Sequence, residues 1–192
     1  MSSIGRRAFA HTLLLAGLVF TAACAKDLPT ENAATPKTTQ PRLDYDPFTY
    51  YVIRNAGSGK VMDVSNAGCC NGQWIHQWTY DGSSNQEWQI VSVGSGYYKI
   101  IAKHSGKGMD IESASQYNGA QLHQWTYQNL YNQQFAITPS GSNGTYYITA
   151  RHSGKALTVV GTLSSNGSLI QQYTYVGASY TPQQWTIEEE SL

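Results

Sequence analysis

Two acids and two tryptophans, repeated at one spacing, are the residues of this chain best suited to contact a ligand. Asp63 precedes Trp78 by the same interval at which Asp110 precedes Trp125. A carboxylate accepts strong hydrogen bonds from ligand donors, and an indole ring covers an apolar ligand face. Each acid could instead accept backbone N–H groups in a turn, and each tryptophan could belong to the core. Recurrence of the pair, together with the loss of the acid at Thr158 in a third copy, favours ligand binding.

The same residues do not predict an enzyme. Glycosidases hold two carboxylates roughly 5–10 Å apart, whereas Asp63 and Asp110 occupy equivalent positions of different copies and are expected to lie far apart. The acidic run at residues 188–190 is expected to be a solvated tail. The sequence contains no Ser/His/Asp signature, no phosphate-binding loop and no metal-spaced set of cysteines and histidines. We therefore expect no catalysis, no cofactor and no metal.

Three internal repeats position these residues. The motif Ser-Gly-Lys begins at Ser58, Ser105 and Ser153, and this nearly constant spacing marks the repeat. Short alternating runs between clusters of Gly, Ser and Asn predict about four strands per repeat and no helix of useful length. Each repeat ends with a Gln-x-aromatic motif whose aromatic side chain is expected to lie in the core: Trp88, Phe135 and Trp185.

The number of repeats selects the fold. A propeller closes with at least about four blades, and a single repeat would leave its apolar face exposed. Three copies that close one barrel around a pseudo-threefold axis predict an all-β protein with the β-trefoil fold. We expect the domain to span residues 47–192, with repeats at about 47–93, 94–140 and 141–189.

Composition agrees with a globular domain that does not bind nucleic acid. Charged residues make up 12% of the chain, and 12 basic residues balance 12 acidic ones. A surface that binds nucleic acid needs a basic stripe, which this balance does not supply. Three cysteines cannot form a disulfide framework, so the core must come from apolar burial. Two of them, Cys69 and Cys70, are expected in a loop.

The N-terminus has the features of an export signal. Arg6 and Arg7 precede an apolar run that ends in small residues before Cys24, and this order predicts a signal peptide over residues 1–23. The segment before Cys24 resembles a bacterial lipobox, which implies that Cys24 is lipidated and anchors an exported lipoprotein, periplasmic or at the cell surface, to a membrane. Ordinary cleavage after Ala-x-Ala, with release of a secreted protein, is the alternative. Residues 24–46 are predicted to be a flexible linker.

The series Met-Asp-Val, Gln-Trp, Asn-Gln and Gln-x-Trp over residues 47–189 resembles the ricin-B-type lectins. The resemblance implies a β-trefoil with up to three sugar sites, one in each repeat, and sugar binding without a metal. The partners that it implies are glycans or polysaccharides. A trefoil that binds or inhibits other proteins is the alternative, but that function would not require Asp, Trp, Asn and Gln to recur together.

The resemblance also implies roles for individual residues. An acid accepts hydrogen bonds from sugar hydroxyls, a tryptophan forms a platform for the sugar ring, and two amides fix its orientation. A histidine stands in each of the first two repeats where the family usually has Gln, which keeps a polar group there. The first-repeat set is Asp63, His76, Trp78, Asn85 and Gln86. The second-repeat set is Asp110, His123, Trp125, Asn132 and Gln133.

Positions that break the repeat are not expected to form sites. Thr158 replaces the acid of the third repeat, and Pro182 replaces its Asn. We therefore expect the third site to be inactive or much weaker. Trp74 has Gln121 and Leu169 as its counterparts, so it is not expected to belong to a repeated site.

Overall fold

The structure is a computed structural model, and it describes residues 44–141, 144–161 and 165–190. All of these residues belong to one unit of the chain, Gln40–Leu192. The predicted signal peptide, Cys24 and nearly all of the predicted linker lie outside the described residues. Within the described ranges, no helix has the length and apolar character needed to cross a membrane.

Twelve strands and five short 3-10 turns make up the regular structure of the described residues, and no α-helix occurs among them. The strands are β1 (Tyr51–Asn55), β2 (Val61–Val64), β3 (Gln73–Trp78), β4 (Trp88–Gly94), β5 (Tyr97–Ala102), β6 (Gly108–Ile111), β7 (Leu122–Trp125), β8 (Phe135–Pro139), β9 (Tyr146–Ala150), β10 (Ala156–Val159), β11 (Ile170–Tyr173) and β12 (Trp185–Glu189). The turns are η1 (Ser65–Ala67), η2 (Ser84–Gln86), η3 (Glu112–Ala114), η4 (Tyr131–Gln133) and η5 (Thr181–Gln183). Each repeat contributes four strands, which confirms the sequence prediction.

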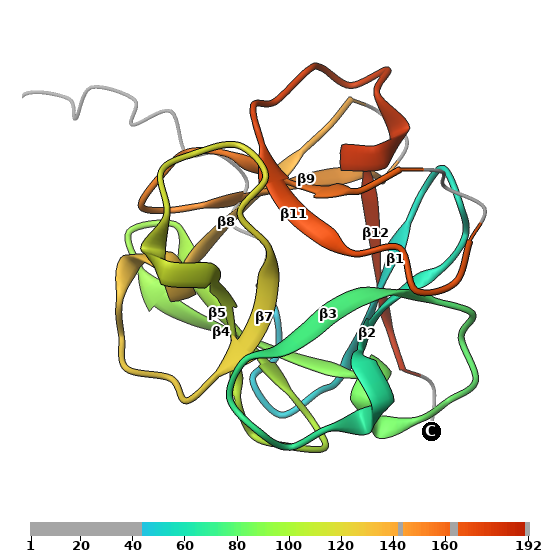
Figure 1. Ribbon diagram of the computed structural model, residues 1–192, viewed down its shortest axis with the longest axis vertical. Coiled ribbons are helices and arrows are strands. Elements are labelled where there is room, and N and C mark those ends of the chain that lie inside the picture. Colours follow the sequence, from blue (N-terminus) through green and yellow to red (C-terminus); the bar gives the residue numbers. More distant parts are fainter. Residues whose placement is uncertain (1–43, 142–143, 162–164, 191–192) are drawn as a thin grey trace, which may run out of the picture. The chain divides into compact units, whose positions relative to one another are not determined.

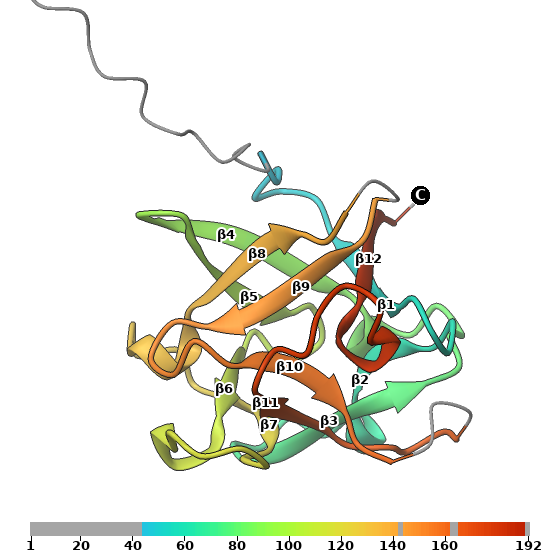
Figure 2. The same cartoon turned by 90° about the horizontal axis from the view of Figure 1, so that it is seen from above.

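Six of these strands form a closed barrel. Within a repeat the first strand pairs with the fourth, as β1–β4, β5–β8 and β9–β12. The barrel is closed between repeats by β4–β5, β8–β9 and β12–β1, and every pair is antiparallel. The other strands form three hairpins, β2–β3, β6–β7 and β10–β11. The hairpins surround the centre of Figure 1 as three lobes and lie at one end of the barrel in Figure 2, which is the predicted β-trefoil.

The aromatic residues that close the repeats fill the core between barrel and hairpins. Trp88, Phe135 and Trp185 are fully buried, which confirms their predicted place. The indole N–H of Trp88 donates to the carbonyl of Met62 at 3.2 Å. Because Met62 precedes Asp63 on β2, this bond connects the core directly to the strand that carries the first acid.

Asn-Gly turns tie each hairpin to the next repeat. The Asn71 side-chain oxygen accepts hydrogen bonds from the backbone N–H of Thr126 at 3.0 Å and from its hydroxyl at 3.1 Å. The same pair of bonds recurs twice around the pseudo-threefold axis, with Asn118 and Thr174, and with Asn166 and Thr79. Parts of two repeats therefore meet beside each hairpin.

Candidate functional site

The first predicted set of residues comes together as one site, here called the repeat-1 site (Asp63, His76, Trp78, Asn85 and Gln86). Asp63 on β2 pairs with His76 on β3, and Trp78 lies two residues farther along β3 on the same face. The turn η2 brings the two amides back toward β2. A cavity of about 240 Å³ is lined by the acid, the histidine, the tryptophan and Asn85.

The carboxylate of Asp63 is nearly buried and fixed by three side chains. Its Oδ1 accepts a hydrogen bond from Nε2 of His76 at 2.9 Å. Its Oδ2 accepts from Nδ2 of Asn85 at 3.0 Å and from Nε2 of Gln86 at 2.9 Å. Asp63 is only 5% exposed and lines the cavity. The three donors fix the orientation of its carboxylate, so the lone pairs that they leave free point in a fixed direction.

The glutamines of the two sets, Gln86 and Gln133, lie behind the sites. They are 1% and 0% exposed, and neither lines the cavity of its repeat. Each donates to a threonine carbonyl at 3.0 Å, that of Thr79 or Thr126. The Oε1 of each accepts a backbone N–H from the loop between that threonine and the glutamine. Both glutamines position the loop, and Gln86 also holds Asp63 through its bond to Oδ2. The preceding asparagine of each turn lines the cavity.

The two platform tryptophans stand partly exposed at the rim of their cavities. Trp78 is 39% exposed and Trp125 is 37% exposed, so neither belongs to the core. Each ring stacks on the histidine of its own strand, with centroids 5.3 Å apart for His76 and 5.5 Å apart for His123. The histidine thus bridges the acid and the indole, and it leaves part of the indole surface open to solvent.

A left-handed turn lines both cavities beside the acid. Asn66 and Ala67 have φ values of 56° and 48°, and Ser113 and Ala114 have 56° and 49°. Non-glycine residues adopt this conformation at a cost of roughly 1–2 kcal/mol each. The same costly turn occurs in both repeats, where it places small side chains and backbone, rather than bulky groups, along the cavity wall.

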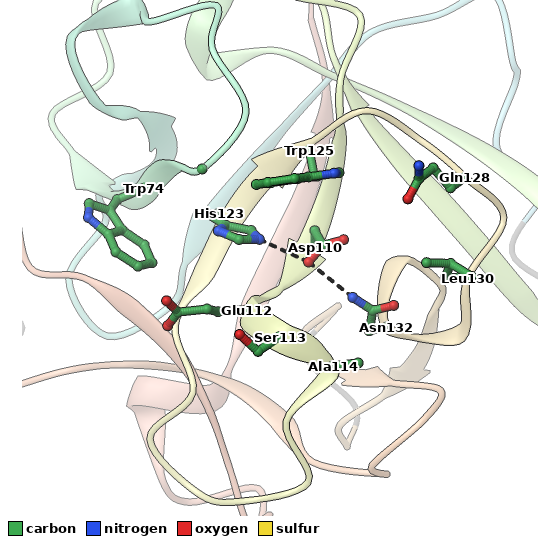
Figure 3. Close-up of a pocket in the computed structure, with 11 residues that line it drawn as sticks. Trp74, Asp110, Glu112, Ser113, Ala114, His123, Trp125, Gln128, Leu130 and Asn132 are labelled. Carbon is green, nitrogen blue, oxygen red and sulfur yellow. Dashed lines mark hydrogen bonds and ion pairs between the residues drawn. The ribbon is translucent and has the colours of Figure 1, made fainter.

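The second predicted set forms the repeat-2 site (Asp110, His123, Trp125, Asn132 and Gln133), and its acid is held differently. Nε2 of His123 and Nδ2 of Asn132 both donate to Oδ1 of Asp110, at 2.9 and 3.0 Å, from opposite sides (Figure 3). No described side chain donates a hydrogen bond to Oδ2 of Asp110. Among the described residues, Oδ2 of Asp110 therefore has no side-chain donor, whereas both oxygens of Asp63 accept hydrogen bonds.

Trp74 lines the cavity of the repeat-2 site although it belongs to the first repeat. It lies on β3 opposite His123 of β7, with the two ring centroids 5.8 Å apart. It is 36% exposed and forms one end of the cavity. Comparison of the repeats missed this residue, because its place depends on the pairing of β3 with β7 and not on its own repeat.

The cavity of the repeat-2 site is the larger of the two, at about 470 Å³ against about 240 Å³ for the repeat-1 site. Figure 3 shows Trp74 at one end of it and Leu130 at the other, with His123 and Asp110 between them. Glu112 also lines this cavity, at the end where Trp74 lies. The shape is a groove with an acid near its middle and an indole on either side of the imidazole.

The third repeat lacks the charged acceptor, as its sequence indicates. Thr158 is 3% exposed, donates to the carbonyl of Ala156 at 3.0 Å and accepts from Nε2 of Gln183 at 2.9 Å. Pro182 lies in η5 where the other repeats have an asparagine. Tyr173 on β11 is exposed and is the aromatic that remains of the pattern.

The two sites offer hydrogen bonds and stacking surfaces. Each contains one acid–imidazole pair, Asp63 with His76 or Asp110 with His123. Across the described residues, no group of three or more His, Cys, Asp and Glu side chains could hold a metal ion. A fixed carboxylate beside an exposed indole suits a ligand that carries hydroxyl donors next to an apolar face.

Comparison with known proteins identifies relatives of this domain. The alpha subunit of clotting factor G from Tachypleus tridentatus is 34% identical over 63 residues, which are 33% of this chain and only 9% of that subunit. Among solved structures, the designed threefold-symmetric protein ThreeFoil is 41% identical, with a TM-score of 0.71 over 73% of this chain and 99% of ThreeFoil. An exo-β-1,3-galactanase from Clostridium thermocellum is 38% identical, with a TM-score of 0.70 over 74% of this chain and 30% of the galactanase.

A family model confirms the resemblance seen in the sequence. The model described as ricin-type beta-trefoil lectin domain-like matches residues 42–125 and 131–191, which is most of the chain. The matched ranges contain both acids, both platform tryptophans and all three closing aromatics. On this match and on the observed fold, the chain belongs to the ricin-type β-trefoil lectin-like family.

Proposed function

We propose that this chain is a non-catalytic carbohydrate-binding protein that binds glycans at the repeat-1 and repeat-2 sites. The observation that carries the proposal is the recurrence of one arrangement in two repeats: a nearly buried carboxylate, fixed by a histidine and an asparagine, beside a partly exposed tryptophan. Membership of a lectin-like family supports the same ligand class.

The proposed contacts follow from the chemistry of a sugar ring. A pyranose has an apolar face, which Trp78 or Trp125 would cover, and a rim of hydroxyls. Asp63 or Asp110 would accept hydrogen bonds from hydroxyls, and such charge-assisted bonds are the stronger ones. The histidine and asparagine hold the acid and line the cavity, so they would fix which hydroxyls can reach it.

Two weak sites on one domain predict a large difference between free sugars and polymers. Binding of one monosaccharide is expected to be about millimolar, or about 4 kcal/mol. A polysaccharide that reaches both sites at once would bind roughly 10²–10⁴-fold more tightly. A glycan array followed by calorimetry on the best monosaccharide and its polymer measures this ratio. Equal affinities for the two would contradict two working sites.

A second function, binding of a protein partner through the trefoil surface, makes a different prediction. If the chain binds proteins, no glycan of the array would bind, whereas a protein ligand would bind tightly. The array therefore decides between the two functions. The galactanase relative makes β-1,3-linked galactose oligomers the first series to include.

We also propose that the domain is exported and tethered to a membrane through Cys24. The signal-like sequence that precedes Cys24 supports this proposal. Lipidation at both the amine and the thiol would anchor the protein stably. A Cys24→Ser variant is expected to move from the membrane fraction to the soluble fraction. Cell fractionation with an immunoblot measures this shift, and a variant that stays in the membrane fraction would rule out the lipid anchor.

A further inference from the structure

The surroundings of the two proposed sites differ at the place where hairpins of neighbouring repeats meet. Beside His123 of the repeat-2 site lies Trp74, which belongs to β3 of the first repeat. Beside His76 of the repeat-1 site the corresponding bridge is made by Leu169. One position of the pseudo-threefold fold therefore holds an indole at one site and an aliphatic side chain at the other.

A second difference lies in the turn after the acid. Glu112 begins η3 and lines the repeat-2 cavity, whereas its counterpart Ser65 begins η1 and does not line the repeat-1 cavity. Among the described residues, none donates a hydrogen bond to the Glu112 carboxylate. Figure 3 shows Glu112 on the same side of His123 as Trp74. An exposed ring and an available acceptor thus occur together at one end of the groove.

We propose that Trp74 and Glu112 form a second sugar position, so that the repeat-2 site binds two consecutive residues of a glycan chain while the repeat-1 site binds one. This inference rests on the proposed glycan-binding function. Trp125 and Asp110 take the first sugar, as Trp78 and Asp63 do in the repeat-1 site. Trp74 covers the apolar face of the next sugar, and Glu112 accepts hydrogen bonds from its hydroxyls.

The geometry supports one continuous site for two rings. The centroid of His123 lies 5.8 Å from that of Trp74 and 5.5 Å from that of Trp125, and it stacks on both at interplanar angles of 26° and 27°. The two indoles are therefore separated by a single imidazole and face one cavity of about 470 Å³. The repeat-1 cavity, at about 240 Å³, is lined by one indole.

The test measures the sugar affinity of each site separately in the full chain. An Asp63→Asn variant leaves the repeat-2 site as the working site, and an Asp110→Asn variant leaves the repeat-1 site. Calorimetry compares three matched series: galactose with β-1,3-galactobiose, glucose with laminaribiose, and xylose with xylobiose. For the series that binds, the disaccharide is expected to bind about tenfold more tightly than the monosaccharide at the repeat-2 site. At the repeat-1 site the gain is expected to be at most about twofold.

Exchange of the distinguishing residues gives matched controls. Trp74→Leu, in the Asp63→Asn background, is expected to remove the disaccharide gain and to leave monosaccharide affinity within about twofold. Glu112→Ser should remove part of the same gain. Leu169→Trp, in the Asp110→Asn background, should create a gain at the repeat-1 site.

The outcomes separate this inference from the function on which it rests. If Trp74→Leu weakens monosaccharide and disaccharide equally, Trp74 only shapes the first sugar position and the second position does not exist. The inference is also wrong if both sites show the same disaccharide gain and Trp74→Leu does not change it. Glycan binding itself would still stand. If none of the three series and no glycan of the array binds, the proposed function fails and this inference fails with it.

Discussion

A Trp88→Ala variant is expected to lose about 3–5 kcal/mol of unfolding free energy, which is the usual cost of removing a core aromatic side chain. Trp88 is fully buried between barrel and hairpins, and its indole N–H donates to the carbonyl of Met62. The substitution would leave a cavity and would remove this buried hydrogen bond. Because single domains are stable by only about 5–15 kcal/mol, a large part of the folding stability is expected to disappear. Urea denaturation followed by fluorescence or circular dichroism measures the change.

The matched control for this prediction is a tryptophan of the same chain that lies at the surface. Trp78 is 39% exposed, so Trp78→Ala is expected to stay within about 1 kcal/mol of the parent in unfolding free energy. The same variant should lose glycan binding at the repeat-1 site. If Trp78→Ala and Trp88→Ala destabilise the domain equally, the assignment of Trp78 as a ligand platform is wrong.

Replacement of both acids, as Asp63→Asn with Asp110→Asn, is expected to abolish measurable glycan binding while the domain stays folded. Hydrogen bonds to a charged acceptor contribute about 1.5–3 kcal/mol, so each site should weaken by roughly tenfold to a hundredfold. An asparagine keeps the size of the acid. Neutral imidazole can donate or accept a hydrogen bond, so His76 and His123 can still pair with it. Calorimetry on the best array ligand, with thermal unfolding as the check on folding, measures both effects.

Three further variants serve as controls for this result. Each single acid variant should keep one site, so monosaccharide binding should persist at about half the stoichiometry, while avidity for a polymer is lost. Thr158→Ala is expected to leave binding unchanged, because the threonine hydroxyl is buried and pairs with Gln183. A large loss in that variant would mean that the third repeat also binds.

The fold could be predicted from the sequence because its signals are local and repeated. The nearly constant period, the alternating runs and the closing aromatic of each repeat are all readable along the chain. Three copies of an amphipathic four-strand unit can bury their apolar faces only against one another. For the same reason Trp88 could be assigned to the core and Trp78 to the surface, and the structure agrees with both.

The sequence by itself therefore determined which residues could form sites and which repeat lacks an acid. The tertiary structure decided which of those residues line a cavity and which support it from behind. Asn85 and Gln86 are neighbours in one turn, and only the direction of η2 shows that one lines the cavity and the other lies behind it. Trp74 has no aromatic counterpart in the other two repeats, and the pairing of β3 with β7 places it in the repeat-2 site. Contacts between repeats depend on strand pairing across long separations, which a comparison of each repeat with the others does not contain.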